Sequence, residues 1–169
     1  FTQQFSKSIG KSAKYKIITE ISKKMDKSIA FCGERNFEDA VRAYKLAIYS
    51  GQLINEKHIP LAKLCLRLAW LHRSYLNQDE EQRFLKLAAS EFEQAYMKCE
   101  TDKDDTPEIY ILYMIGELNR KLGNYNEAIQ YFAKVIEHQD KNMYIKYVNL
   151  ARNQWKRTAE EYRDCQGVK

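Results

Sequence analysis

The sequence is poor in the residues that interrupt helices. It has six glycines and two prolines among 169 residues, while 44% of its residues are hydrophobic and 30% are charged. Sheet proteins need a turn after each short strand, and those turns draw on glycine and proline. The shortage therefore disfavours a β-rich fold and favours an all-α protein. At this length we expect one domain, large enough to bury about 70% of the surface of the unfolded chain.

The sequence also lacks a segment that would cross a membrane. No apolar run approaches the roughly 18 residues of a spanning helix, and no short apolar stretch follows a basic amino terminus as in a signal peptide. We therefore expect no membrane partner and a cytoplasmic location. The sequence begins at Phe1 and not at Met, so we expect it to be a piece of a longer protein.

Residues with metal-binding or catalytic spacing are missing as well. The four cysteines lie 33, 34 and 66 residues apart, whereas zinc sites and redox motifs use closely spaced pairs. They are Cys32, Cys65, Cys99 and Cys165. The three histidines, which have no partner at triad or metal-ligand spacing, are His58, His72 and His138. We predict reduced cysteines, no catalytic residue, no metal, no cofactor and no enzymatic activity.

What the sequence does contain is a pattern of large and small residues between positions 112 and 132. The pattern consists of Leu112, Ile115, Gly116, Ala128 and Phe132. It resembles the signature of a tetratricopeptide repeat, in which two short antiparallel helices cross closely at small residues. The resemblance implies a helical hairpin with Gly116 and Ala128 in its core. Asn119 replaces a tyrosine that is usual in the signature, and would place a polar group in or beside the ligand groove.

Local signals also mark where these helices begin and end. Gly123 can adopt the left-handed conformation that ends a helix, and Asn124 followed by Glu127 predicts a capping box at the start of the next one. Further upstream, Thr106 before Pro107 predicts a helix start with Thr106 as the N-cap.

Two further copies of the pattern precede this one. The order of residues in 36–48 matches that in 124–136, with Ala40 at the place of Ala128. The middle copy has Ala88 at this place, 48 residues after Ala40 and 40 before Ala128, against a usual period of about 34. We therefore expect longer helices in the middle copy, with a projecting turn near 75–79. The expected helices are 12–32, 36–51, 57–77, 79–100, 107–122, 125–139 and 142–164.

These copies predict the domain organisation. Residues 1–11 form a disordered or irregular basic leader, and residues 12–165 form one tetratricopeptide-like helical domain. Its repeats cover about 12–51, 57–100 and 107–139, and a capping helix covers 142–164. The resemblance implies that the hairpins stack into a right-handed superhelix of about seven helices.

Positive charge is concentrated at the amino terminus. Residues 1–30 hold seven lysines and two acidic residues, a net charge of +5 that equals the formal charge of the whole chain. Such a segment could bind the phosphates of a nucleic acid or an anionic lipid in a salt-dependent way. The alternative is an amphipathic helix docked on the bundle, because apolar residues from Tyr15 to Cys32 follow a helical stripe opposite the lysines.

In tetratricopeptide scaffolds the first helix of each pair lines a concave groove. The repeat register gives these groove candidates: Lys63, Arg67, Trp70, Arg73, Tyr110, Tyr113, Glu117 and Arg120. Such a lining would suit an extended or helical peptide with acidic and apolar side chains, because arginine pairs carboxylates and aromatic rings provide contact area. The alternative is that Trp70 and the tyrosines only fill the space between helices. The lysine and asparagine by which some of these domains hold a C-terminal carboxylate are replaced by Met25 and Ile29, so that clamp is not expected.

Four segments resemble a bacterial family known only as a domain of unknown function. They are residues 31–35, 40–47, 64–71 and 113–120, and the resemblance covers roughly 30–160. It concerns the tetratricopeptide-bearing part of that family and implies no established activity. Members typically carry an upstream cysteine-paired segment that resembles a zinc site, and nothing in this sequence matches it. The sequence thus predicts a non-catalytic scaffold that binds a protein or peptide, with nucleic-acid binding through the lysine-rich segment as the alternative, and it indicates no oligomeric state.

Overall fold

The computed structural model describes residues 10–32, 34–101 and 106–167, and their side chains except at 25–35. It divides into two compact units, which we call unit 1 (Phe1–Phe84) and unit 2 (Leu85–Lys169). The boundary falls inside one helix, so the expected second repeat, 57–100, is divided between the units. The single domain of stacked repeats therefore stays a prediction. Most of the expected basic leader, 1–11, lies outside the described residues.

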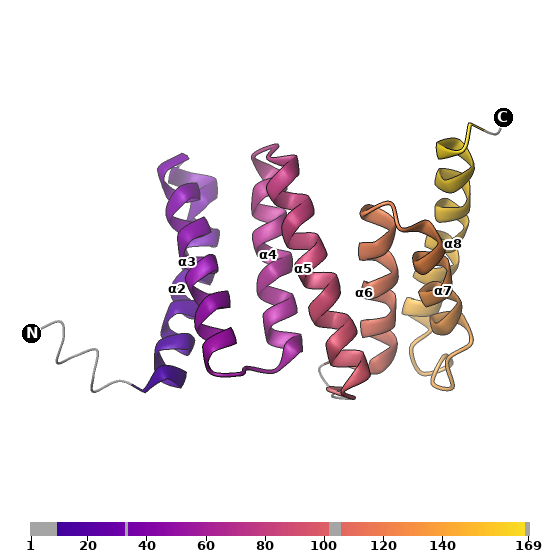
Figure 1. Ribbon diagram of the computed structural model, residues 1–169, viewed down its shortest axis with the longest axis horizontal. Helices are drawn as coiled ribbons and strands as arrows, with labels where there is room; N and C mark the ends of the chain where they lie inside the picture. The colour runs from indigo at the N-terminus through magenta and orange to yellow at the C-terminus, as the bar shows by residue number, and fades with distance from the viewer. Residues whose placement is uncertain (1–9, 33, 102–105, 168–169) are drawn as a thin grey trace, which may run out of the picture. The chain divides into compact units, whose positions relative to one another are not determined.

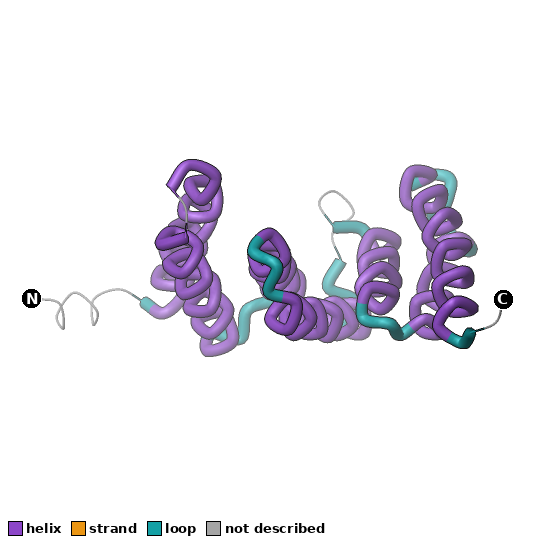
Figure 2. Tube along the Cα trace, turned by 90° about the horizontal axis from the view of Figure 1, so that it is seen from above, coloured by secondary structure: helices purple, strands orange, loops and turns teal. Residues whose placement is uncertain are grey.

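The described residues form seven α-helices and no strand (Figures 1 and 2). The helices are α2 (Lys11–Cys32), α3 (Glu34–Leu53), α4 (His58–Ser74), α5 (Gln78–Met97), α6 (Glu108–Lys121), α7 (Tyr125–Ile136) and α8 (Ile145–Cys165). The all-α prediction is confirmed, and every helix end lies within three residues of its expected position. None of the described helices combines the length and the apolar composition needed to cross a bilayer.

In unit 1, α2 and α3 pack against each other as an antiparallel pair, and α3 also contacts α4 (Figure 1). The core of this unit includes Tyr44 of α3 and Leu68 of α4, both fully buried. Gly51 lies where the three helices meet: a Cβ there would be 2.5 Å from Cδ2 of Leu61 and 3.0 Å from the ring of Tyr15. The missing side chain of Gly51 therefore allows α3 to approach both neighbours.

In unit 2, α6 and α7 form a second hairpin, and α8 packs on both of them. A Cβ at Gly116 would lie 2.8 Å from the ring of Phe132, which is itself fully buried. Ala128 is also fully buried in this core, together with Ile109 and Val135. The expectation that Gly116 and Ala128 permit close packing of a helical hairpin is confirmed.

The ends of α6 and α7 differ from the sequence prediction in one respect. Gly123 has φ of +81°, so the left-handed helix end is confirmed. Asn124 does occupy the N-cap position of α7, but its side chain makes no capping hydrogen bond. Its Nδ2 instead donates to Oδ1 of Asn119 at 3.2 Å, while Nδ2 of Asn119 donates to the carbonyl oxygen of Ile115 at 2.8 Å. The predicted capping box is therefore wrong, because the buried amide of Asn119 uses the side chain that would have capped the helix.

The start of α6 is displaced by one residue from the prediction. The N-cap is Pro107 and not Thr106, and no side chain caps this helix end by a hydrogen bond. Pro107 has φ of −68° and ψ of 154°, an extended conformation that cannot form the first helical residue. The helix consequently begins at Glu108, an acidic residue next to the positive end of the helix dipole.

The helices of the expected middle copy, α4 with 17 residues and α5 with 20, are longer than α6 and α7 with 14 and 12, but they are not longer than α2 and α3 with 22 and 20. The turn between α4 and α5 contains Leu76, whose side chain is 88% exposed. Its φ of 58° lies in the left-handed region, which is unfavourable for leucine. This turn therefore presents an apolar side chain to solvent on a strained backbone.

Candidate functional site

The groove candidates of unit 1 all lie on α4, and most of this helix is buried. Nine of its residues are buried, from Leu61 to His72. Lys63 and Trp70 are exposed and Arg67 is half-buried, and spacings of four and three residues place these three along one line of the helix. We call this line the α4 strip. Arg73 is also exposed but is turned to one side of that line. The sequence prediction thus identified the part of α4 that faces solvent.

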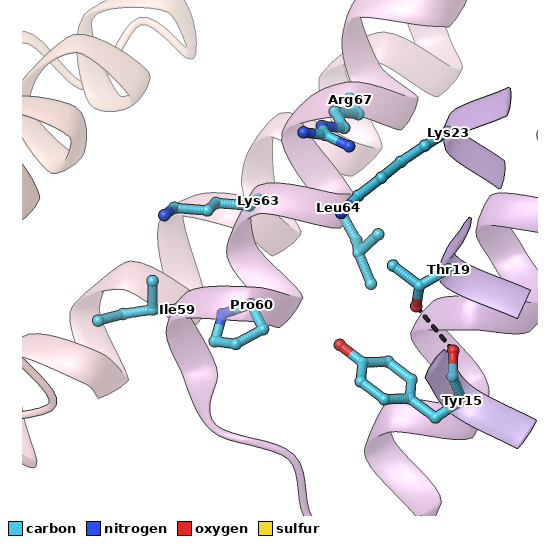
Figure 3. Close-up of a pocket in the computed structure, with 8 residues that line it drawn as sticks. All are labelled: Tyr15, Thr19, Lys23, Ile59, Pro60, Lys63, Leu64 and Arg67. Atoms are coloured by element: carbon cyan, nitrogen blue, oxygen red, sulfur yellow. Dashed lines mark hydrogen bonds between the residues drawn. The ribbon is translucent and has the colours of Figure 1, made fainter. Parts of the chain in front are cut away.

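A cleft of about 200 Å³ lies beside the α4 strip, between α2 and α4 (Figure 3). It is lined by Tyr15, Thr19 and Lys23 of α2 and by Ile59, Pro60, Lys63, Leu64 and Arg67 of α4. Three of these side chains are cationic, two carry hydroxyl groups and three are apolar, and the described lining includes no carboxylate. We call this space the α2–α4 cleft.

The side chains of the α2–α4 cleft approach it from both helices. Figure 3 shows the ring of Tyr15 pointing from α2 toward Pro60, and Lys23 extending from α2 toward α4. Lys63, which also lines the cleft, extends away from Tyr15 in this view. Arg67 and Lys23 therefore define the cationic part of the cleft, while Tyr15 and Pro60 define its apolar part.

Tyr15 and Thr19 differ in what they can offer a ligand. The hydroxyl of Thr19 donates to the backbone carbonyl oxygen of Tyr15 at 2.8 Å, so its proton is already used. Tyr15 is 6% exposed, and burial raises the pKa of its hydroxyl, an effect increased by the nearby carboxylate of Glu56 and reduced by the side-chain hydrogen bond with Thr19. Tyr15 therefore stays protonated at neutral pH and remains a hydrogen-bond donor.

Lys23 and Arg67 have weak competition from carboxylates. Nζ of Lys23 lies 3.5 Å from Oε1 of Glu20, but the two side chains are 39% and 65% exposed. An ion pair that is this exposed contributes about 0–1 kcal/mol and is screened by salt. Among the described residues, Arg67 forms no ion pair. A ligand carboxylate in the cleft would therefore displace little existing structure.

The charged groove candidates of unit 2, Glu117 and Arg120, already bind other side chains of that unit. Arg120 is buried; its Nη2 lies 2.6 Å from Oε1 of Glu117 and its Nη1 lies 3.1 Å from Oε1 of Glu161. Gln154 also donates to Glu117, at 2.7 Å. The hydrogen bond with Glu117 raises the pKa of Arg120. These contacts join α6 to α8, so the charges of Glu117 and Arg120 are already balanced inside the unit.

The two groove tyrosines are also in packing contacts. The ring centroid of Tyr110 lies 5.7 Å from that of Tyr147 and 6.3 Å from that of Phe92, and that of Tyr113 lies 5.9 Å from that of Phe132. Burial is the main cause that raises the pKa of both tyrosines. This arrangement matches the alternative that the tyrosines fill space between helices. Trp70 differs from them because it is 48% exposed.

Comparison with known proteins places the chain in a bacterial family. Residues 1–158 match the family described as an uncharacterized protein conserved in bacteria (DUF2225). The chain belongs to this family. No curated protein and no solved structure matches it. Membership of DUF2225 agrees with the bacterial family of unknown function that the sequence segments resemble, and the family description carries no activity with it.

A second cleft of this DUF2225 member, about 180 Å³ in volume, lies in unit 2 beside His138. The backbone N–H of Asp140 donates to Nδ1 of His138 at 3.0 Å, so the proton of the neutral ring is on Nε2. Nε2 lies 3.2 Å from Oε1 of Glu108 and donates to it. His138 and Glu108 are thus already paired with each other in this cleft. The described residues contain no group of three or more side chains placed to hold a metal ion.

His72 is the remaining polar side chain of interest in this family member. It is 4% exposed, and its ring stacks on Phe84 and meets Phe37 edge-on, each at 5.7 Å between centroids. Its Nδ1 lies 3.5 Å from Nδ2 of Asn77, and its Nε2 has no hydrogen-bond partner. Burial lowers the pKa of His72, the carboxylate of Glu80 raises it, and Lys45 lowers it. His72 is therefore a packing residue whose pKa is lowered mainly by burial.

Proposed function

We propose that this chain is a non-catalytic scaffold that binds another protein or a peptide, and that its binding surface is the α4 strip with the adjoining α2–α4 cleft. The observation that carries the proposal is the pair of cations, Lys23 and Arg67, beside this cleft, where the described lining has no carboxylate. Charged groups gathered in this way repel one another unless an anion joins them. A ligand with negative charge removes that repulsion.

Trp70 supports a macromolecular ligand. Its side chain is 48% exposed on the same strip as Arg67. Tryptophan and arginine are the side chains that most often dominate the affinity of protein interfaces. An exposed tryptophan next to a basic cleft is therefore better suited to a protein or peptide than to a small ion.

We further propose that the helical hairpins are tetratricopeptide-like. Two close contacts support this, that of Gly116 with Phe132 in unit 2 and that of Gly51 with Leu61 in unit 1. In such hairpins small residues set the distance between neighbouring helices. The function proposed for the α4 strip does not depend on this assignment.

The test is selection of peptides from a randomised library on the immobilised chain of 169 residues. We expect enrichment of a set of peptides whose binding falls about tenfold or more in Arg67→Glu, because charge reversal places a carboxylate in the cleft. Arg42→Glu is the matched control. Arg42 is an exposed arginine of α3 in the same unit, and its ion pair with Asp39 is long, at 3.9 Å, and exposed to solvent. Absence of any enriched peptide would contradict the proposal.

A second candidate function is nucleic-acid binding by the lysines of α2. Lys11, Lys16 and Lys24 are all exposed on this helix, which favours contact with phosphates. Replacing these three lysines by glutamine should then reduce retention of bulk RNA and weaken its dependence on salt. If the chain is a peptide-binding scaffold, the same three replacements should leave peptide binding unchanged. The lysine variants therefore distinguish the two functions.

A further inference from the structure

We infer that the α2–α4 cleft receives an acidic side chain of the bound protein, with an apolar neighbour of that side chain packed against Ile59 and Pro60. The inference rests on the proposed function and specifies the chemistry of its ligand. It concerns a carboxylate carried inside a peptide segment, which distinguishes it from capture of a chain end.

The size of the cleft excludes most alternatives to a side chain. Its volume of about 200 Å³ is below the roughly 300–1,000 Å³ of pockets that enclose drug-sized ligands. A nucleotide or an organic cofactor would not fit in it. One or two amino-acid side chains would, provided that the rest of the ligand runs over the surface.

The charges of the cleft favour a carboxylate. Arg67 lies on α4 and Lys23 on α2, and both helices pack against α3 in unit 1. The two positive charges are therefore carried by ordered helices. The guanidinium group of an arginine is a planar fork that matches the two oxygens of a carboxylate. The protonated hydroxyl of Tyr15 adds a neutral donor at the other end of the cleft. Arg67 and Lys23 together can pair with one carboxylate of a ligand.

The apolar wall explains why an isolated anion would be a poor ligand. Ile59 and Pro60 are half-buried and line the same space as the cations, whereas Leu64 and Tyr15 beside them are only 3% and 6% exposed (Figure 3). Burial of apolar surface contributes roughly 25 cal/mol per Å². An anion alone would leave this wall in contact with water. An acidic residue with an apolar neighbour would cover both parts.

Trp70 gives the bound segment a direction. It lies three residues after Arg67, which corresponds to about 4.5 Å along the helix axis at 1.5 Å per residue. An extended peptide advances about 3.3 Å per residue. A residue one or two positions from the acidic one would therefore reach the exposed ring of Trp70. We infer a short extended motif that crosses the cleft and continues along the α4 strip.

The experiment uses the full chain and the peptide most enriched in the selection described above, labelled for fluorescence polarisation. Each acidic residue of the peptide is replaced by its amide, and each apolar neighbour by serine. The chain variants are Arg67→Gln, Lys23→Gln and Lys63→Gln, with Arg42→Gln as the control. Thermal melting of every variant shows whether it is folded.

We expect one acidic position of the peptide at which replacement by the amide weakens binding about tenfold, as for a charge-assisted hydrogen bond. Arg67→Gln should weaken binding by a similar factor, and in this variant the amide replacement should have little further effect. Lys23→Gln should weaken binding less, and Lys63→Gln least, because Lys63 extends away from Tyr15. Serine in place of the apolar neighbour should also reduce affinity.

Two outcomes would overturn the inference while leaving the scaffold proposal intact. One is an enriched peptide whose binding depends on no acidic residue, or depends equally on Arg42 and Arg67. The other is a gain of about tenfold when phosphoserine replaces the acidic residue, which would assign the cleft to a phosphate group. Failure to enrich any peptide would instead remove the proposed function itself.

Discussion

The two units use arginine in opposite ways. Arg120 of unit 2 is buried and shared between Glu117 and Glu161, whereas Arg67 of unit 1 is half-buried and lines a cleft whose described residues include no carboxylate. The first arrangement joins two helices and leaves no charge for a ligand. The second contributes little to the fold, and its charge has no ion-pair partner among the described residues. A basic residue on a helix face is therefore informative about function only when its partners are known.

The largest effect is expected from removing the two arginines. Arg120→Leu should lower the free energy of unfolding of unit 2 by about 3–5 kcal/mol, because two carboxylates lose the cation between them. Arg67→Leu should change that of unit 1 by no more than about 0.5 kcal/mol. Urea unfolding followed by tryptophan fluorescence separates the units, since Trp70 lies in unit 1 and Trp155 in unit 2. Replacing one tryptophan by phenylalanine leaves a reporter for the other unit. Equal losses would remove the contrast between the two arginines.

The next largest effect is expected from replacing the closely packed glycine of each unit by alanine. Gly116→Ala should destabilise unit 2 by about 1–2 kcal/mol, because the new methyl group meets the buried ring of Phe132 at 2.8 Å. Gly51→Ala in unit 1 should cost less, since its closest contact is Cδ2 of Leu61, a terminal methyl group that can rotate away. The melting temperatures of the two variants compare the costs. A larger loss at Gly51 would show that unit 1 is the more tightly packed.

A dependence on pH is expected in unit 1. Burial lowers the pKa of His72, so the folded state binds a proton less readily than the unfolded state. The stabilisation is complete above the unfolded pKa of about 6.5 and is lost as the pH falls from there toward the lower folded value. His72→Phe should flatten this part of the profile of Trp70 unfolding. The charged groups that act on His72 are Glu80, which raises its pKa, and Lys45, which lowers it, and an unchanged profile would contradict the prediction.

The smallest effect is expected at the turn between α4 and α5. Leu76→Gly should raise the free energy of unfolding of unit 1 by about 0.5–1 kcal/mol, because glycine adopts positive φ without strain. Little packing is lost, since the leucine side chain is 88% exposed. The gain is measured by the same urea titration. A loss of stability would show that Leu76 makes contacts that its exposure does not indicate.

The helices were predictable because their signals are local. Apolar spacing, Gly123 and Pro107 fixed the elements to within a few residues. Gly51 was missed because a single glycine inside a helical segment carries no pattern, although it allows three helices to meet. The capping box was wrong because Asn119, five residues before Asn124, uses the amide that was expected to cap α7.

The candidate site was predictable only in part. The repeat register found Lys63, Arg67 and Trp70, since it identifies which face of α4 is exposed. It could not find Tyr15 or Lys23, because their approach to α4 results from tertiary packing between segments about 40 residues apart. For the same reason it did not separate Arg67 from Arg120. The partner of Arg120 on α8 lies 41 residues away in sequence.

The contacts of His138 have a consequence for the connection between α7 and α8. This connection runs from residue 137 to residue 144, and His138 ties its start to Glu108 at the beginning of α6. The N–H of Asp140 holds the ring in place from within the connection itself. A tether of this kind shortens the freely moving part of a loop and so reduces the entropy that must be given up on ordering it. The last helix can then be aligned on its neighbours by a short remaining link.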